Sequence, residues 1–116
     1  MAKRILVIDD DFEDLTTIKN VLESANYRVV GATNGAQGLD ILKKDGFDLI
    51  LIDIQMPTLS GYDLLRLLRE KLNHKVKMIY VTIVPKTDVD LDGIDGFVQK
   101  PFSPQTLLKE IKRLIK

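Results

Sequence analysis

The run Leu49-Ile50-Leu51-Ile52 constrains the fold of this chain more than any other feature, because it has no polar residue to turn toward water. Side chains alternate between the two faces of a strand, so four consecutive apolar residues predict a strand that is covered on both faces. Such strands belong to parallel sheets, whose crossover segments are usually helices that pack on the two faces. We therefore predict an α/β protein with three layers.

The rest of the chain alternates short apolar runs with amphipathic segments. We predict five strands, at about residues 4–8, 27–32, 47–53, 76–82 and 96–99. Apolar residues recur at helical spacing between and after them: Leu15, Ile18, Leu22 and Ala25; Leu39 and Leu42; Leu64, Leu65 and Leu68; Leu107, Leu108, Ile111, Leu114 and Ile115. This alternation predicts a doubly wound parallel sheet with right-handed crossovers, in a single domain over residues 1–116.

Three of the predicted helices have residues that favour a helix start. Ser103 followed by a proline predicts an N-cap and a first helical residue. Asn34 with Gln37, and Ser60 with Asp63, have the spacing of a capping box, in which two residues bond each other's backbone N–H groups.

Composition argues against several classes of function. Seventeen basic and seventeen acidic residues give a net charge of zero, so we expect no general affinity for nucleic acid or membrane surfaces. The absence of cysteine excludes disulfides and thiolate metal sites. No apolar stretch approaches the ~20 residues of a membrane span, and the first apolar run is too short for a signal peptide. We expect a soluble, cytoplasmic protein.

Polar side chains stand where four of the predicted strands end. Asp9 and Asp10 follow the first strand, Asp53 ends the third, Thr82 ends the fourth and Lys100 follows the fifth. The carboxyl ends of parallel strands lie along one edge of a sheet, where α/β proteins bind their ligands. These five side chains should therefore share one site.

The residue types at this edge suit phosphoryl chemistry. Three clustered carboxylates repel one another, and Mg²⁺ would relieve that repulsion while leaving coordination positions for phosphate oxygens. Asp53 is then placed to attack phosphorus as a carboxylate nucleophile. The ammonium of Lys100 and the hydroxyl of Thr82 would stabilise the charge on the phosphoryl oxygens.

Four motifs occur in one order along the chain: Ile5 to Asp10, Asp53 to Pro57 with Gly61, Val81-Thr82, and Lys100-Pro101-Phe102. In these motifs the chain resembles, over its whole length, the receiver domains of two-component response regulators. The resemblance implies a flavodoxin-like sheet with strand order 2-1-3-4-5, the order of flavodoxin and of the chemotaxis receiver. It also implies a signalling domain of a phosphorelay rather than an enzyme, with at most slow self-dephosphorylation.

The resemblance further implies a role for each matching residue. Asp53 would accept a phosphoryl group from a sensor histidine kinase or a histidine phosphotransfer protein. Asp10 and Asp53 would ligate Mg²⁺ directly, Asp9 would act through water, and the backbone carbonyl of Gln55 would complete the protein ligands.

The same resemblance implies a switch. Thr82 and Lys100 would sense the phosphoryl group, Phe97 occupies the aromatic switch position, and the Lys100-Pro101 bond would be cis. The output would be altered binding to an unknown partner protein by a monomer or weak dimer. We expect no attached output domain.

The chain departs from the family between Thr82 and Lys100, where it is shorter than usual. Pro85 and the acidic stretch that follows argue against a full fourth helix, so we predict one turn or a loop. Ile83 stands where a small residue often admits the phosphodonor. Gln55 and Val84 occupy positions that tune hydrolysis of the aspartyl phosphate, and we expect slow self-hydrolysis because valine cannot orient a water.

Two other functions stay open. One is a phosphorylation-independent interaction module of receiver fold, which the altered stretch after Thr82 favours. The other is a Mg²⁺-dependent phosphohydrolase, which needs a second acid shortly after Asp53 where Gln55 stands instead.

Two remaining features have simpler explanations. The acids at 88, 90 and 92 with Gly93 have the spacing of a calcium loop, but Gln99 stands where such a loop has a bidentate glutamate, so we interpret them as an acidic loop. His74 has no acidic or cysteine partner nearby in the sequence, and we interpret it as a solvated loop residue.

Overall fold

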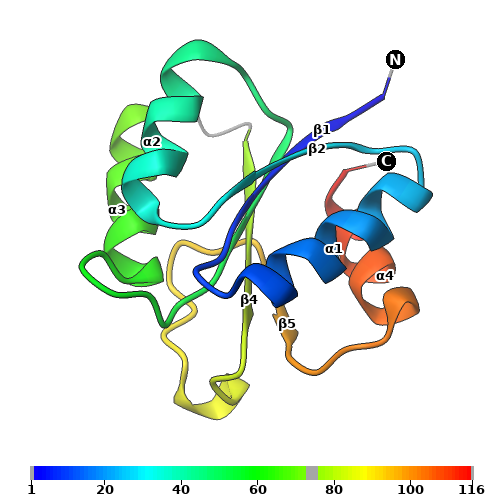
Figure 1. The fold of residues 1–116 in the computed structure, drawn as a ribbon. Helices are drawn as coiled ribbons and strands as arrows, with labels where there is room; N and C mark the ends of the chain where they lie inside the picture. Colours follow the sequence, from blue (N-terminus) through cyan, green and yellow to red (C-terminus); the bar gives the residue numbers. More distant parts are fainter. Residues whose placement is uncertain (1, 73–75, 116) are drawn as a thin grey trace.

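The computed structural model describes residues 2–72 and 76–115 and has the three layers that the sequence predicts (Figure 1). His74 lies outside the described residues. Five parallel strands form one sheet in the order β2-β1-β3-β4-β5, which confirms the flavodoxin-like order 2-1-3-4-5. The strands are β1 (Arg4–Ile8), β2 (Arg28–Ala32), β3 (Leu49–Ile52), β4 (Lys77–Thr82) and β5 (Gly96–Gln99). The helices are α1 (Phe12–Ser24), α2 (Gly35–Lys44), α3 (Gly61–Lys71) and α4 (Pro104–Leu114).

Strand β3 lies at the centre of the sheet and contributes to two separate cores. Leu49 and Leu51 belong to the core beneath α1 and α4, whereas Ile50 and Ile52 belong to the core beneath α2 and α3. Figure 1 shows these helix pairs on opposite faces of the sheet. Both faces of β3 are therefore buried, which confirms the explanation that the sequence suggests for its unbroken apolar run.

The predicted and observed elements differ mainly at their ends. Strand β3 is shorter than the predicted 47–53, because its pairing with β1 covers Leu49 to Ile52 only. Helix α1 ends at Ser24, and Ala25 is its C-cap. None of the described helices is long and apolar enough to cross a membrane.

The fourth helix is shortened, as predicted. Residues 83–95 are all described, and they contain only a 3₁₀ turn, Lys86–Asp88, between β4 and β5. Pro85 precedes this turn as its N-cap residue and has no side-chain capping bond to offer. The helix labelled α4 is therefore the last amphipathic segment of the sequence, and a loop covers this part of the sheet.

Capping follows the sequence in part. The side chains of Asn34, Ser60 and Ser103 each accept a hydrogen bond from a backbone N–H in the first turn of their helix. The return bond predicted for a capping box goes elsewhere, since Gln37 Oε1 accepts from the N–H of Thr33 at 2.7 Å instead of from Asn34. Asp63 likewise accepts from Arg66, one helical turn further on, because its arm is short.

Candidate functional site

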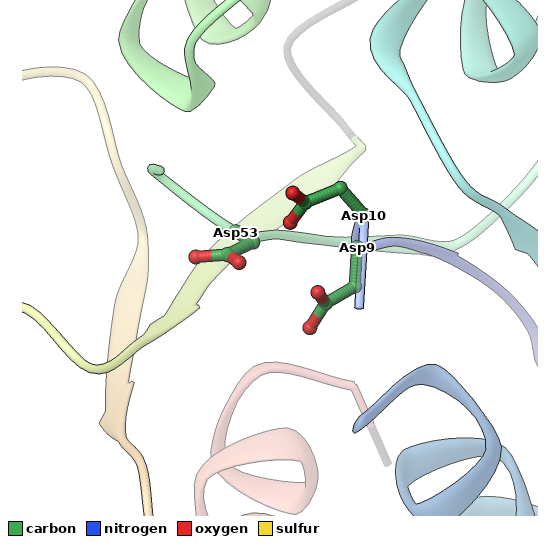
Figure 2. Close-up of side chains that lie close together, drawn as sticks. All are labelled: Asp9, Asp10 and Asp53. Atoms are coloured by element: carbon green, nitrogen blue, oxygen red, sulfur yellow. The ribbon is translucent and has the colours of Figure 1, made fainter. Parts of the chain in front are cut away.

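The ends of β1 and β3 hold three carboxylates close together. The backbone N–H of Asp9 donates to Ala32 and that of Asp53 donates to Ile8, so the sheet ladder continues into both residues. One carboxylate oxygen from each of Asp9, Asp10 and Asp53 lies within 4.8 Å of the others. Figure 2 shows the three carboxylates gathered beyond the strand ends. The structure therefore brings together the three acids that the sequence predicts.

These acids differ strongly in their exposure to water. Asp9 is 1% exposed and Asp53 is 7% exposed, whereas Asp10 is exposed. Burial raises the pKa of Asp9 to about 6, against the opposing effect of its bond from Lys100. The cluster consequently concentrates negative charge where water screens it poorly, which is an environment that favours a bound cation.

Lys100 is the cation that the fold supplies. Its side chain is 8% exposed, and its Nζ lies 2.7 Å from Asp9 Oδ2 and 3.5 Å from Asp53 Oδ2. A third carboxylate, that of Asp14, accepts from the same Nζ at 2.8 Å. Burial by itself lowers the pKa of Lys100, but the bonds to Asp14 and Asp9 outweigh it and hold the pKa above its ordinary value. The side chain of Lys100 is therefore protonated and positively charged.

Thr82 lies at the same edge of the sheet. It is fully buried at the end of β4, and its carbonyl accepts from the N–H of Lys100 at 2.8 Å, which joins the ends of β4 and β5. Its hydroxyl accepts from the N–H of Val84 at 3.2 Å. This bond uses an acceptor lone pair and leaves the hydroxyl proton available as a donor.

The remaining predicted residues surround this edge. Phe97 is partly buried against the core beneath α3, and its N–H donates to Glu110 Oε2 at 3.0 Å. The Lys100-Pro101 peptide is cis, as the resemblance implies. Gln55 is exposed, and its N–H donates to Asp53 Oδ1 at 3.4 Å.

Gly61 lets the backbone of helix α3 approach Asp53 closely. A Cβ atom at this position would press against the carbonyl oxygen of Asp53 and lie 2.7 Å from the Cα of Ile54. The N–H of Gly61 donates to the carbonyl of Ile54 at 2.8 Å. This close approach requires glycine at position 61, and the bond from Gly61 to Ile54 holds the segment that carries Asp53.

The acids of the 88–93 loop form no comparable group. Among the residues that the structure describes, only Asp9, Asp10 and Asp53 gather as three potential metal ligands. Asp90 Oδ1 accepts instead from the N–H of Asp92 at 3.0 Å. These contacts favour the interpretation of this segment as an acidic loop.

Asp14 is the residue of this edge that sequence reasoning missed. It stands in the first turn of α1, where an acid is ordinarily explained by the helix dipole or by capping. Its contact with Lys100 joins residues 86 positions apart, so only the folded chain reveals it. No local sequence pattern distinguishes such an acid from an ordinary one.

Comparison with protein families gives one match that covers most of the chain. Residues 5–112 match the family described as the response regulator receiver domain. Among curated proteins, the chain is 33% identical over 120 residues to the nisin biosynthesis regulatory protein of Lactococcus lactis, covering 100% of this chain and 52% of that protein. It is also 33% identical to the transcriptional regulatory protein CpxR of Escherichia coli, covering 97% and 49%. The chain thus spans about half the length of these curated relatives.

Solved structures match over nearly the whole chain. The chemotaxis protein CheY4 of Vibrio cholerae is 28% identical with a TM-score of 0.91, and the match covers 99% of this chain and 100% of that one. The response regulator TrrA of Thermotoga maritima, solved in complex with Mg²⁺ and BeF, is 30% identical with a TM-score of 0.89, covering 97% and 99%.

Proposed function

Because the chain belongs to the response regulator receiver domain family, we propose that it is a phosphoacceptor signalling domain in which Asp53 is the acceptor. The phosphodonor would be a phosphohistidine on a sensor histidine kinase or a histidine phosphotransfer protein. One observation is the main support for this proposal. At one edge of the sheet, the carboxylates of Asp9, Asp10 and Asp53 lie close together and beside the buried ammonium of Lys100.

The donor set fits Mg²⁺. All three side chains offer carboxylate oxygens, the ligands this ion prefers, and the exposed Asp10 leaves the cluster open toward water that Mg²⁺ usually retains. Burial raises the pKa of Asp9, so the ionised carboxylate of this residue is poorly solvated and would gain from a nearby cation. Asp10, Asp53 and the carbonyl of Gln55 would hold the ion, with Asp9 acting through water. When bound, Mg²⁺ would neutralise charge on the phosphoryl oxygens.

The chain's own residues would then carry the transfer. A carboxylate oxygen of Asp53 forms a bond to phosphorus while the bond from phosphorus to the imidazole nitrogen of the donor breaks. Lys100 and Thr82 would donate hydrogen bonds to the phosphoryl oxygens, whose charge grows during transfer. Asp53 would attack as a carboxylate, and its Oδ2 lies 3.5 Å from the ammonium of Lys100.

Phosphorylation adds nearly two negative charges beside Lys100 and Thr82, which would change their contacts. Phe97, a partly buried residue of β5, would report this change to an output protein. A phosphohydrolase is less well supported, because Gln55 stands where the general acid of such an enzyme would be. We therefore propose a switch whose self-dephosphorylation is at most slow.

Intact mass spectrometry after incubation with Mg²⁺ and acetyl phosphate tests the proposal. We expect one base-labile adduct on the wild type and none on Asp53→Asn. Because Ile83 could exclude acetyl phosphate, phosphoramidate serves as a second donor. The absence of an adduct with both donors, or an equal adduct on Asp53→Asn, would refute the assignment of Asp53.

A second pair of measurements tests the switch. Lys100→Ala should still take up the phosphoryl group but lose most of the chemical-shift change that phosphorylation causes at Phe97. An intact response would contradict the sensing role of Lys100. The segment between β4 and β5 contains a 3₁₀ turn and no α-helix, which favours one rival, an interaction module that ignores phosphorylation. Equal partner binding by the wild type and Asp53→Asn would support that rival.

A further inference from the structure

Lys100 is held in this structure by two short bonds, and neither of them goes to Asp53. Its Nζ donates to Asp9 Oδ2 at 2.7 Å and to Asp14 Oδ2 at 2.8 Å, whereas Asp53 Oδ2 lies 3.5 Å away. An ammonium group has three donors. Two of these donors are therefore committed to acids other than Asp53.

The two bonds differ in their surroundings. The side chain of Asp9 is 2% exposed, whereas that of Asp14 is 42% exposed. Water can replace the lysine as a partner for Asp14, but not readily for Asp9. The bond to Asp14 is consequently the one that can break at low cost.

Helix α1 fixes the position of Asp14. The side chain of Asp11 caps the helix by accepting from the N–H groups of Glu13 and Asp14. The N–H of Asp11 in turn donates to Asp9 Oδ1 at 2.9 Å, which ties the cap to the buried acid. Asp14 is therefore connected through hydrogen bonds to the edge that holds the acid cluster, although it stands outside the predicted ligand set.

We propose that Asp14 is a positioning residue that holds Lys100 in the arrangement without phosphate and so opposes its turn toward a phosphoryl group on Asp53. This inference rests on the proposed function. Asp14 opposes the phosphorylated state because it engages the ammonium group that would otherwise donate to the phosphoryl oxygens. Its removal should favour the phosphorylated arrangement, whereas removal of a ligand or of the lysine should disfavour it.

Beryllofluoride with Mg²⁺, a stable mimic of the phosphoryl group, provides the test by titration calorimetry. Asp14→Asn should bind it about two- to fivefold more tightly than the wild type, the range expected for releasing a half-exposed ion pair. Glu13→Gln is the matched control, since Glu13 is an exposed acid in the same helical turn that bonds Asp11 through its backbone N–H. Equal effects of the two substitutions, or weaker binding by Asp14→Asn, would overturn the proposal.

The Lys100→Ala background separates positioning from general electrostatics. Without the lysine, Asp14→Asn should change beryllofluoride affinity no more than Glu13→Gln does. An undiminished advantage of Asp14→Asn in this background would refute a role that acts through Lys100.

A direct readout keeps this inference distinct from the proposed function. In metal-free wild type, the ammonium protons of Lys100, observed by ¹⁵N-edited NMR, should be protected from exchange with water. Asp14→Asn should lose much of this protection, whereas Glu13→Gln should retain it. Protection that Asp14→Asn leaves unchanged would overturn the anchoring role whatever beryllofluoride does. Failure of every variant to bind beryllofluoride, with this difference in protection present, would count against phosphoacceptor function and not against the anchor.

Discussion

Asp53→Asn should stabilise the metal-free protein although it removes the proposed acceptor. Asp53 lies 3.5 Å from the ammonium of Lys100, an attraction of about 5 kcal/mol at an effective dielectric constant of ~20. Its oxygen also lies within 4.8 Å of oxygens of Asp9 and Asp10, and each repulsion amounts to at least about 3.5 kcal/mol on the same scale. Asp10 is exposed, so water weakens its share. We expect a net gain of roughly 1–2 kcal/mol in the free energy of unfolding.

Urea denaturation in EDTA provides the assay, with a thermal shift of about 3–10 °C as a second readout. Asp92→Asn is the control, because it makes the same chemical change in an exposed loop. Saturating Mg²⁺ should reverse the order of stability. At a concentration of 100 times its Kd, the ion stabilises the wild type by about 2.7 kcal/mol, whereas Asp53→Asn lacks one ligand and gains less. The reasoning fails if Asp53→Asn is less stable than the wild type in EDTA, or if Mg²⁺ leaves the order unchanged.

Three further predictions concern the acid cluster and its supports. Burial raises the pKa of Asp9 to about 6, so the folded chain holds a proton that the unfolded chain releases near pH 3.8. The unfolding free energy of the metal-free wild type should therefore fall relative to Asp9→Asn as the pH rises from about 4 to about 6 in urea titrations, and a constant difference would contradict the raised pKa. Gly61→Ala should reduce both the free energy of unfolding and the rate of phosphorylation by acetyl phosphate, because the added Cβ would press against the backbone of Asp53 and Ile54. Wild-type values for both would show that this backbone can move aside at little cost. Ser103→Ala should lower the unfolding free energy by about 1 kcal/mol through loss of the α4 cap without changing phosphorylation, and unaltered urea stability would show that the cap contributes nothing.

The placement of the acid cluster could be predicted from the sequence because it follows from topology. Each of Asp9, Asp53 and Thr82 stands at the end of an apolar run, and parallel pairing brings the ends of such runs to one edge. The shortened fourth element could also be predicted, since Pro85 and the acidic stretch that follows it disfavour a full helix. Both features depend on local patterns that the chain carries before it folds.

Other features depend on which atoms the fold brings together. Gln37 and Asp63 have the spacing of capping-box residues, yet their side chains bond Thr33 and Arg66, because side-chain reach and competing donors decide the partner. The pKa of Asp9 is likewise a property of the folded site, since its burial and its contact with Lys100 arise only when β1 and β5 share a sheet.

By itself the sequence determined the strand order, through its resemblance to receiver domains, and the set of polar residues at the strand ends, through the periodicity of its apolar runs. Only the tertiary structure decided which carboxylates form hydrogen bonds with the ammonium of Lys100. Asp9 and Asp14 are 91 and 86 residues away from it in the chain. The strand-end pattern placed Asp9 and Lys100 at one edge, but it did not show which acids the ammonium bonds and did not include Asp14. Both hydrogen bonds of the Lys100 ammonium are shorter than 3 Å, and such contacts depend on how α1 packs against the sheet. The partners of the lysine are therefore evident only in the folded structure.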